Sequence, residues 1–330
     1  MRKALEVKRK IGIEKIIKEK IEEIKSICSE GATVAFSGGL DSSVALSLAI
    51  DALGKEKVQA LMVSFGSHSY STAIEGAKKF IKSIDFKLNI YEESGIQNKI
   101  WEKGPSCNAC TRNAKLPTVE KYAKFPMIIT GSNLSDSWGK YGLKINGRFY
   151  SPLMDLNKPT INNILDYYGL KIYRAGENIY REGCKLKHLL KMNANQDFHG
   201  KAVDLSNEKL IEILRYHSIK TEIANVKIIG PLSKNIALIN VFPDLNETLK
   251  SEIFDEISKI EAIDEVYFVD SPISLTIMAN PGLFNNSNSL KWVEQGRIQP
   301  EFVRPIKFKW LKSKNKKLST FSVVAFEKLL

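Results

Sequence analysis

The stretch 32–49 limits the possible folds of this chain more than any other. Residues 32–36 form a short apolar run that predicts a buried strand, and residues 42–49 read as the start of a helix. Gly38 and Gly39 stand between them, and glycine lets the backbone approach a ligand closely. A strand, a glycine turn and a helix in this order direct free backbone N–H groups and the positive end of the helix dipole toward one point. The stretch therefore predicts a binding site for an anion such as a phosphate group.

Three hydroxyl groups, those of Ser37, Ser42 and Ser43, surround the same turn and add hydrogen-bond donors. The spacing is neither that of the Walker A loop, which needs GxxxxGK followed by Ser or Thr, nor the GxGxxG of dinucleotide-binding proteins. The string SGGLDSS is similar instead to the pyrophosphate-binding loop (PP-loop) of the ATP pyrophosphatase superfamily. This resemblance implies an enzyme that cleaves ATP between its α and β phosphates, adenylates an oxygen of the substrate and releases pyrophosphate. An ordinary strand–turn–helix corner is the alternative, but it would not require all these specified positions.

Segments typical of strands and helices alternate through the first half of the chain. A long helix is expected over residues 1–30, with an isoleucine stripe at spacings of three and four. The strands expected after it cover residues 32–36, 58–65, 86–90 and 126–130. Alternation of this kind predicts an α/β fold with a doubly wound parallel sheet. Because ligands bind at the carboxyl ends of the strands in such sheets, we expect Val63 and Gly131 at the nucleotide site.

The pattern changes downstream of residue 200. The strands expected there cover residues 224–229, 235–242, 264–270 and 272–279, with one helix over 247–260. This order indicates a smaller α+β domain of the ferredoxin-like kind. We therefore expect an N-terminal helix (1–30), a PP-loop ATP pyrophosphatase domain (31–200) and a C-terminal α+β domain with a basic tail (201–330).

Composition and charge limit the kinds of molecule that this protein is expected to bind. With 330 residues, 43% of them hydrophobic and 26% charged, the chain has the size and composition of a globular protein of two domains. No run is long enough to span a membrane and the N-terminus lacks the apolar segment of a signal peptide, so we expect a cytoplasmic protein without a membrane partner. The net charge of +12 indicates an anionic partner such as ATP, RNA or a phosphorylated small molecule, although lysine-rich compositions also occur in AT-rich genomes.

Four cysteines are too few for a disulfide framework, and a Cys-x-x-Cys pair in a reducing compartment indicates metal or redox chemistry. Cys28 lies on the apolar stripe of the first helix and is interpreted as a core thiol. Cys107, Cys110 and Cys184 each follow turn residues, and three thiolates can hold a 4Fe–4S cluster with one iron left open to sulfide. The same three could form a zinc site with His188 as fourth ligand, or carry out redox or sacrificial sulfur chemistry. The plain alternative is an incidental pair to which Cys184 is unrelated.

Two families resemble this arrangement. The segment Cys107-Asn-Ala-Cys110-Thr-Arg112, followed by a helix, resembles the CxxC-x-R element of the PP-loop enzymes that thiolate tRNA. The layout further along is similar to the LarE family of ATP-dependent sulfur transferases, of the three-cysteine kind with a 4Fe–4S cluster. The elements that carry this second resemblance are Gly131-Ser-Asn133-Leu-Ser-Asp136, Tyr141-Gly-Leu143, Ser151-Pro-Leu153 and Cys184. Ser135 departs from it, because an aspartate is usual there, and Asp136 alone is left to position metal or substrate.

The resemblance implies ATP-dependent sulfur insertion with ATP, Mg²⁺ and a 4Fe–4S cluster. The contacts expected for the ATP phosphates are Ser37, Gly38, Gly39, Ser42 and Ser43, with Asp41 and Asp136 near Mg²⁺. The residues expected to bind and use the cluster are Cys107, Cys110 and Cys184, of which Cys184 is also expected to act in catalysis. Sulfide or a sulfur-donor protein would supply the sulfur. Arg112, Lys115 and Arg148 are further candidate contacts to anions, each also compatible with plain surface charge.

Three alternatives stand beside this interpretation: a tRNA-thiolating enzyme, a PP-loop amidotransferase or ligase, and an RNA-binding module. The amidotransferase or ligase would adenylate a carboxylate for attack by ammonia and carry a structural zinc, whereas the intact SGGLDSS string disfavours a module without catalysis. We expect a small-molecule acceptor rather than tRNA, because basic residues are spread from Lys3 to Lys328 and not gathered in one block. The cluster Lys307 to Lys317 keeps RNA as an alternative, since it interleaves Phe308 and Trp310 and aromatic rings can stack on bases. A homo-oligomer is compatible with each of these.

Overall fold

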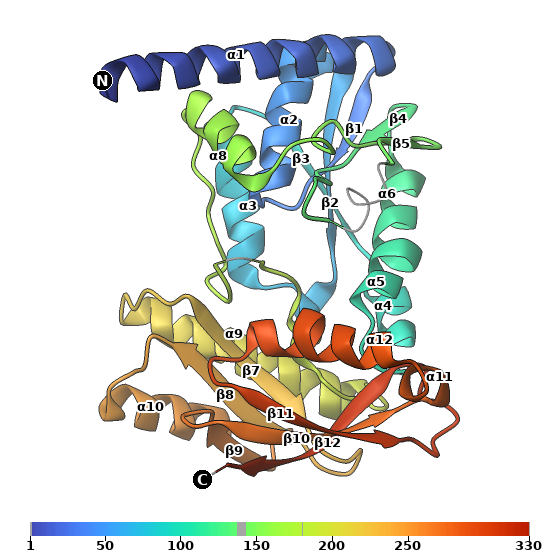
Figure 1. The fold of residues 1–330 in the computed structure, drawn as a ribbon, viewed down its shortest axis with the longest axis vertical. Coiled ribbons are helices and arrows are strands. Elements are labelled where there is room, and N and C mark those ends of the chain that lie inside the picture. Colours follow the sequence, from blue (N-terminus) through green and yellow to red (C-terminus); the bar gives the residue numbers. More distant parts are fainter. Residues whose placement is uncertain (1, 137–142, 180, 330) are drawn as a thin grey trace. The chain divides into compact units, whose positions relative to one another are not determined.

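The computed structural model describes residues 2–136, 143–179 and 181–329, and the chain divides into two compact units that are interleaved in sequence (Figure 1). Unit 1 comprises Met1–Ser64, Thr72–Glu93 and Lys115–Arg174, and unit 2 comprises Phe65–Ser71, Ser94–Ala114 and Ala175–Leu330. The segments that carry Cys107, Cys110 and Cys184 therefore group with the C-terminal part of the chain, whereas the sequence-based division placed them in the nucleotide domain.

Packing around one turn gives the physical reason for this grouping. The backbone N–H of Ser319 donates to the carbonyl of Lys103 at 2.7 Å. A Cβ on Gly104 would lie 2.5 Å from the side chain of Thr320 and 3.0 Å from that of Leu318. The segment that carries the Cys-x-x-Cys pair is thus held by contacts with residues 318–320, and no local sequence pattern predicts these contacts.

Unit 1 is built on a six-stranded sheet with the strand order β3-β2-β1-β4-β6-β5. The strands are β1 (Ala32–Ala35), β2 (Val58–Ser64), β3 (Leu88–Glu92), β4 (Met127–Ile129), β5 (Ile145–Asn146) and β6 (Phe149–Tyr150). Neighbouring strands pair in parallel, except that β5 is antiparallel to β6. The α/β fold with a parallel sheet is therefore confirmed. The order also places β1 beside β4, at the point where the winding of the sheet reverses and such folds bind ligands.

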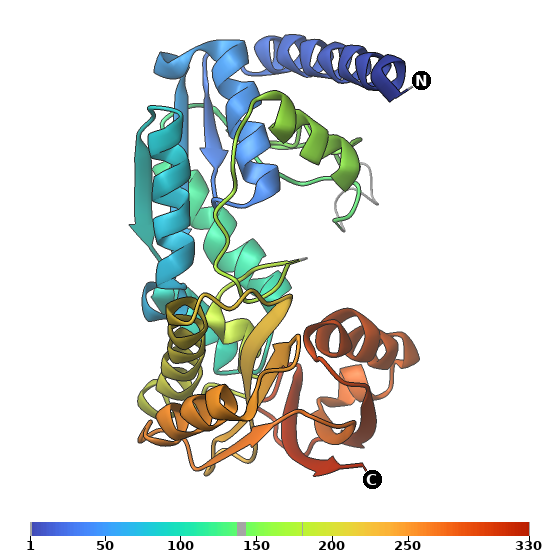
Figure 2. The same cartoon turned by 90° about the vertical axis from the view of Figure 1, so that its left-hand side faces the viewer.

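Helices cover the sheet of unit 1 and bury its core. They include α1 (Arg2–Ile27), α2 (Leu40–Leu53), α3 (Ser71–Ser83), α6 (Leu116–Tyr122) and α8 (Lys158–Tyr167). Helix α1 lies against α2 and α8 (Figures 1 and 2), and its isoleucine stripe buries Ile17 and Ile24. Cys28 at the end of this stripe is 1% exposed, and burial raises the pKa of its thiol to about 12. It is a core thiol, as the sequence predicts.

Unit 2 contains two three-stranded sheets, one with the order β7-β8-β9 and one with the order β11-β10-β12. The strands are β7 (Ile223–Ile229), β8 (Ile236–Phe242), β9 (Glu265–Phe268), β10 (Ile273–Ala279), β11 (Ile306–Lys312) and β12 (Phe321–Lys328). The helices include α4 (Ser94–Trp101), α5 (Cys107–Cys110), α9 (Lys201–Tyr216), α10 (Glu247–Ser258), α11 (Pro281–Phe284) and α12 (Ser287–Lys291). Helices α9 and α10 pack on the first sheet, and α11 lies against the second (Figure 2).

The smaller region downstream of residue 200 is confirmed as a mixture of strands and helices, but its ferredoxin-like arrangement is wrong. A ferredoxin-like unit would join the four expected strands in one sheet. Here β10 leaves the sheet of β9 and pairs with β11 and β12, two strands from the basic tail. No helix within the described part of the chain is both long and apolar enough to cross a membrane.

Candidate functional site

The loop between β1 and α2 has the backbone that a phosphate-binding turn requires. Strand β1 ends at Ala35 and α2 begins at Leu40, so the predicted strand, glycine turn and helix are all present. Gly38 has φ +77°, in the region that favours glycine, and a Cβ there would lie 2.9 Å from the Cβ of Ala77 on α3. The glycine is thus required both by the backbone conformation and by the close approach of α3.

Serine hydroxyl groups form hydrogen bonds within the loop, and one of the three hydroxyls takes no part in them. The Ser42 hydroxyl donates to the carbonyl of Gly39 at 3.0 Å and accepts from the backbone N–H of Ser37 at 3.1 Å. The Ser42 and Ser37 hydroxyls also lie 3.1 Å apart. By contrast, the Ser43 hydroxyl is buried and has no hydrogen-bond partner among the described residues. The geometry therefore makes Ser42 a residue that holds the loop, whereas the buried hydroxyl of Ser43 has no such role among the described residues.

The second segment of the site comes from the end of β4. Gly131 approaches the start of α2 so closely that a Cβ would lie 2.8 Å from the backbone nitrogen of Ser42. Asp136 follows in the same turn, where its carboxylate accepts from the backbone N–H of Asn133 at 3.0 Å. Val63 lies at the carboxyl end of β2, beyond the last pairing of that strand with β1, and is 7% exposed. Tyr141 and Gly142, which contributed to the sequence resemblance, lie outside the described residues.

Asp41 is the electrostatic centre of this site. The ammonium of Lys158, at the first turn of α8, lies 2.5 Å from one of its carboxylate oxygens. Burial raises the pKa of Asp41, and the negative charge of Asp136 acts in the same direction, while Lys158 and Arg174 act to lower it. The other oxygen, Oδ1, is buried without a hydrogen-bond partner in the described chain. Two carboxylates and two cations therefore surround the phosphate loop.

The two cations beside Asp41 were not found by sequence reasoning, and one residue that it proposed has another role. Arg148 donates to the backbone carbonyls of Pro126 at 2.8 Å and Phe125 at 3.0 Å, so it fastens the entry to β4 rather than facing the phosphate loop. Lys158 could have been suspected, because it stands at a helix start capped by Asn157 shortly after the Ser-Pro-Leu element. For Arg174 the sequence offers no signal.

Residues 11–113 match the family described as NAD synthase. This stretch includes the phosphate loop, so the part of the chain around the loop is similar to NAD synthase. Among its relatives, an uncharacterized protein of Methanocaldococcus jannaschii is 28% identical over 259 residues, which are 66% of this chain and 84% of that protein. An NH(3)-dependent NAD(+) synthetase of the same organism is 27% identical over 172 residues, or 48% of this chain and 64% of the synthetase. The corresponding synthetase of Pyrococcus furiosus is 29% identical over 92 residues, or 28% of this chain and 35% of that protein.

Three of the four cysteines belong to unit 2. Cys107 and Cys110 lie on α5, and Cys184 begins the short turn Lys185–His188. Cys184 interacts electrostatically with the other two, so the three thiols lie near one another, and none of the four cysteines forms a disulfide. Burial raises the pKa of Cys184 to about 12. The structure thus brings together the three cysteines that the sequence singled out.

The zinc alternative through His188 does not fit this group. Both ring nitrogens of His188 are engaged, Nε2 with Glu177 at 3.1 Å and Nδ1 with the ammonium of Lys227 at 2.7 Å. Within the described chain, no three Cys, His, Asp or Glu side chains are placed to bind one metal ion. A 4Fe–4S cluster sets a different requirement, because each thiolate binds its own iron and the sulfurs stand further apart than the ligands of a single ion.

The basic strand β11 presents its lysines and aromatic rings on opposite faces. Lys307 and Lys309 are exposed, whereas Phe308 and Trp310 pack against the buried core of unit 2. The core therefore partly covers both rings, and RNA binding at residues 307–317 stays a prediction.

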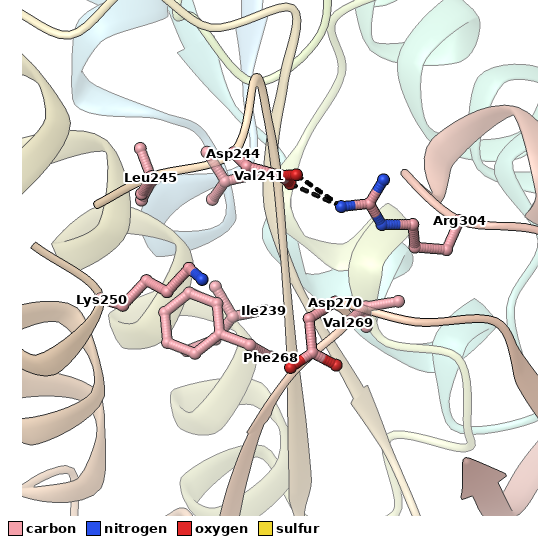
Figure 3. A pocket seen from close by; sticks show the side chains of 9 residues that line it. All are labelled: Ile239, Val241, Asp244, Leu245, Lys250, Phe268, Val269, Asp270 and Arg304. Carbon is pink, nitrogen blue, oxygen red and sulfur yellow. Dashed lines mark hydrogen bonds and ion pairs between the residues drawn. The ribbon is translucent and has the colours of Figure 1, made fainter. Parts of the chain in front are cut away.

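Unit 2 also contains a hollow of about 230 Å³ between β8, β9 and the start of α10 (Figure 3). Arg304 points toward Asp244 there, and its guanidinium donates to both carboxylate oxygens at 2.8 and 2.6 Å. The other two charged residues of the hollow are also paired, Lys250 with Glu247 and Asp270 with Lys328. The charges that line this hollow are therefore compensated. Its lining includes no residue of the phosphate loop or of the cysteine group.

Proposed function

We propose that this protein is an ATP-dependent sulfur transferase, which adenylates an oxygen of its substrate with release of pyrophosphate. Sulfur then takes the place of that oxygen, which leaves as part of AMP. The use of ATP follows from the NAD synthase-like PP-loop domain. The observation that favours sulfur chemistry is the gathering of Cys107, Cys110 and Cys184 as neighbouring thiols from two separate segments of unit 2.

In the ATP site, this chain's groups bind and neutralise the phosphates. Backbone N–H groups at Gly38 and Gly39 and the hydroxyl of Ser43 donate to phosphate oxygens. Lys158 and Arg174 supply positive charge where negative charge develops as pyrophosphate leaves. Asp41 and Asp136 would hold Mg²⁺, and the buried, unpartnered Oδ1 of Asp41 fits such a role. When bound, the ion would neutralise phosphate charge.

The three cysteines would hold a 4Fe–4S cluster, and the donor set fits this group in chemistry. All three are thiols outside any disulfide, and the surroundings of Cys184 include the side-chain amide of Gln97, which donates to its sulfur at 3.3 Å. A cluster on three thiolates would supply one iron without a protein ligand, to which sulfide binds. The further partners of the proposal are sulfide or a sulfur-donor protein and a small-molecule acceptor, the latter supported by the inward-facing rings of β11.

An ammonia-dependent ligase is the second candidate, and the comparisons favour it. Three relatives of this chain are named NH(3)-dependent NAD(+) synthetases, and such an enzyme would need the same phosphate loop. In this case ammonia would attack the adenylate, and the three cysteines would have no part in the reaction.

One experiment separates the candidates. Protein purified without oxygen is analysed for iron, then incubated with ATP, Mg²⁺, a small-molecule extract of cells and either radiolabelled sulfide or labelled ammonium. Sulfur transfer predicts bound iron and sulfide label in a small molecule, lost in Cys184→Ala and kept in Cys28→Ala. Iron-free protein that incorporates only ammonium would establish the ligase, and sulfide label in added tRNA would overturn the choice of acceptor.

A further inference from the structure

The hollow in unit 2 lies at the end of a parallel pair of strands, beside the helix that joins them (Figure 3). Strand β8 pairs in parallel with β9, and α10 connects the two along the chain. The lining of the hollow comes from the ends of both strands, the start of α10 and the segment before β11. Folds with parallel strands bind ligands at the carboxyl ends of the strands, and the positive end of a helix dipole favours an anionic group.

The size and the walls of the hollow fit a small ligand with an apolar part. Its volume is about 230 Å³. A water molecule takes up about 30 Å³ of the liquid, so the hollow holds about eight groups of that size. Ile239 and Val241 of β8 and Val269 after β9 line it, and none of the three is more than 6% exposed. The ring of Phe268 adds a further apolar surface.

The charges of the hollow favour a ligand that carries both a positive and a negative group. Lys250 and Arg304 extend into it from opposite sides (Figure 3), and Asp244 and Asp270 add two carboxylates. Lys250 interacts electrostatically with both carboxylates, so groups of opposite charge are neighbours. Because the lining holds as many cations as carboxylates, a ligand with a net charge would unbalance it. A ligand with an ammonium group and a carboxylate close together keeps the balance, and a free amino acid has this arrangement.

Two of the charged groups have partners that a ligand can replace. Lys250 pairs with Glu247, whose side chain is 89% exposed. Asp270 pairs with Lys328, and both of these side chains are half-exposed. Exposed ion pairs contribute little free energy, so their exchange for contacts with a ligand costs little.

The third group, Arg304, has a hydrogen-bond donor to spare. One terminal nitrogen of its guanidinium is held by both carboxylate oxygens of Asp244, at 2.8 and 2.6 Å. Its Nε is buried and has no hydrogen-bond partner within the described part of the chain. Buried donors without a partner are rare in folded proteins, and a ligand carboxylate beside Arg304 would satisfy this one.

We propose that the hollow binds a free amino acid with a small branched apolar side chain, and valine matches its size. The carboxylate accepts from the ammonium of Lys250 and from Nε of Arg304, and the ammonium group of the ligand contacts Asp270. The branched side chain lies against Ile239 and Val241. All these residues belong to unit 2 and none belongs to the phosphate loop or to the cysteine group, so the inference does not depend on the proposed function.

The test is calorimetric titration of the full chain, without ATP or sulfide, with L-valine, isovalerate and isobutylamine. Isovalerate lacks the ammonium group of valine and isobutylamine lacks its carboxylate, so each is expected to bind at least tenfold more weakly than L-valine. Lys250→Met and Asp270→Asn each remove one charged contact and are expected to weaken L-valine binding at least tenfold at an unchanged Tm. Lys259→Met is the matched control, because Lys259 also pairs with a glutamate three positions before it on α10, but does not line the hollow.

Three results would overturn the inference. The first is L-valine that does not bind at millimolar concentration, or binds no more tightly than isovalerate or isobutylamine. The second is wild-type affinity in both Lys250→Met and Asp270→Asn, because the bound valine would then lie elsewhere. The third is an equal loss of affinity in Lys259→Met, because the loss of any surface charge would then explain the effect.

Discussion

Gly131→Ala tests the closeness of β4 to the phosphate loop. The backbone at Gly131 does not have a positive φ, so alanine can adopt its conformation, and the new methyl group is the only perturbation. That methyl would lie 2.8 Å from the nitrogen of Ser42, 2.9 Å from the carbonyl carbon of Asp41 and 3.0 Å from the Cβ of Asp41. Two of these three atoms are backbone at the start of α2, so the clash cannot be relieved by turning a flexible side chain.

The geometry gives the size of the effect. Ordinary contact begins at 3.4 Å, so the start of α2 must retreat by about 0.6 Å. Overpacking of this kind costs about 1–3 kcal/mol. If half of a 2 kcal/mol penalty falls on the nucleotide complex, affinity for ATP weakens about fivefold, since about 1.4 kcal/mol is tenfold. The other half lowers Tm by about 2–4 °C for a unit of this size.

Calorimetric titration with ATP and Mg²⁺ measures the loss of affinity, and thermal unfolding of the free protein measures the loss of stability. Gly12→Ala is the matched control, because Gly12 lies on α1 with no atom within 4 Å of its new Cβ. It should leave ATP affinity unchanged, and alanine in a helix raises stability slightly. Wild-type affinity and wild-type Tm in Gly131→Ala would refute the close approach and with it the placement of the β4 turn at the phosphate loop.

Three further predictions address the charges of the structure. Lys158→Ala should weaken ATP binding about tenfold. It should change the stability of the free protein by less than about 1 kcal/mol, because the ion pair of Lys158 with Asp41 is partly exposed. An unchanged affinity in calorimetry would show that Lys158 does not contribute to the ATP site. Arg148→Ala should do the reverse, lowering Tm through the lost carbonyl contacts and leaving ATP affinity intact, and a selective loss of affinity would contradict its structural role. Burial lowers the pKa of Lys191 to about 7, so between pH 7 and 10 the unfolded chain holds a proton that the folded chain has released, and stability rises with pH. Urea unfolding should therefore show wild-type protein gaining about 1 kcal/mol per pH unit relative to Lys191→Met in this window, and parallel pH profiles would show that Lys191 does not titrate there.

The sequence by itself determined the phosphate loop and the kind of sheet that carries it. SGGLDSS is contiguous, and its conformation depends on glycine geometry and on the ends of one strand and one helix, all of which are local properties. The alternation of apolar runs with helical stripes likewise predicted the parallel sheet. The inward rings of β11 could also have been predicted, because the strand period of two puts Phe308 and Trp310 on the same face as the buried Ile306.

Only the tertiary structure decided which distant residues share a site. Lys158 reaches Asp41 across 117 positions of sequence, and Arg174 joins them from further still, because strand order and helix packing bring these segments together. The same holds for Gln97 and Cys184, 87 positions apart. Each of these side chains is an ordinary polar residue in its own segment. What brings these side chains together is the packing of the folded chain, and no local sequence pattern records it.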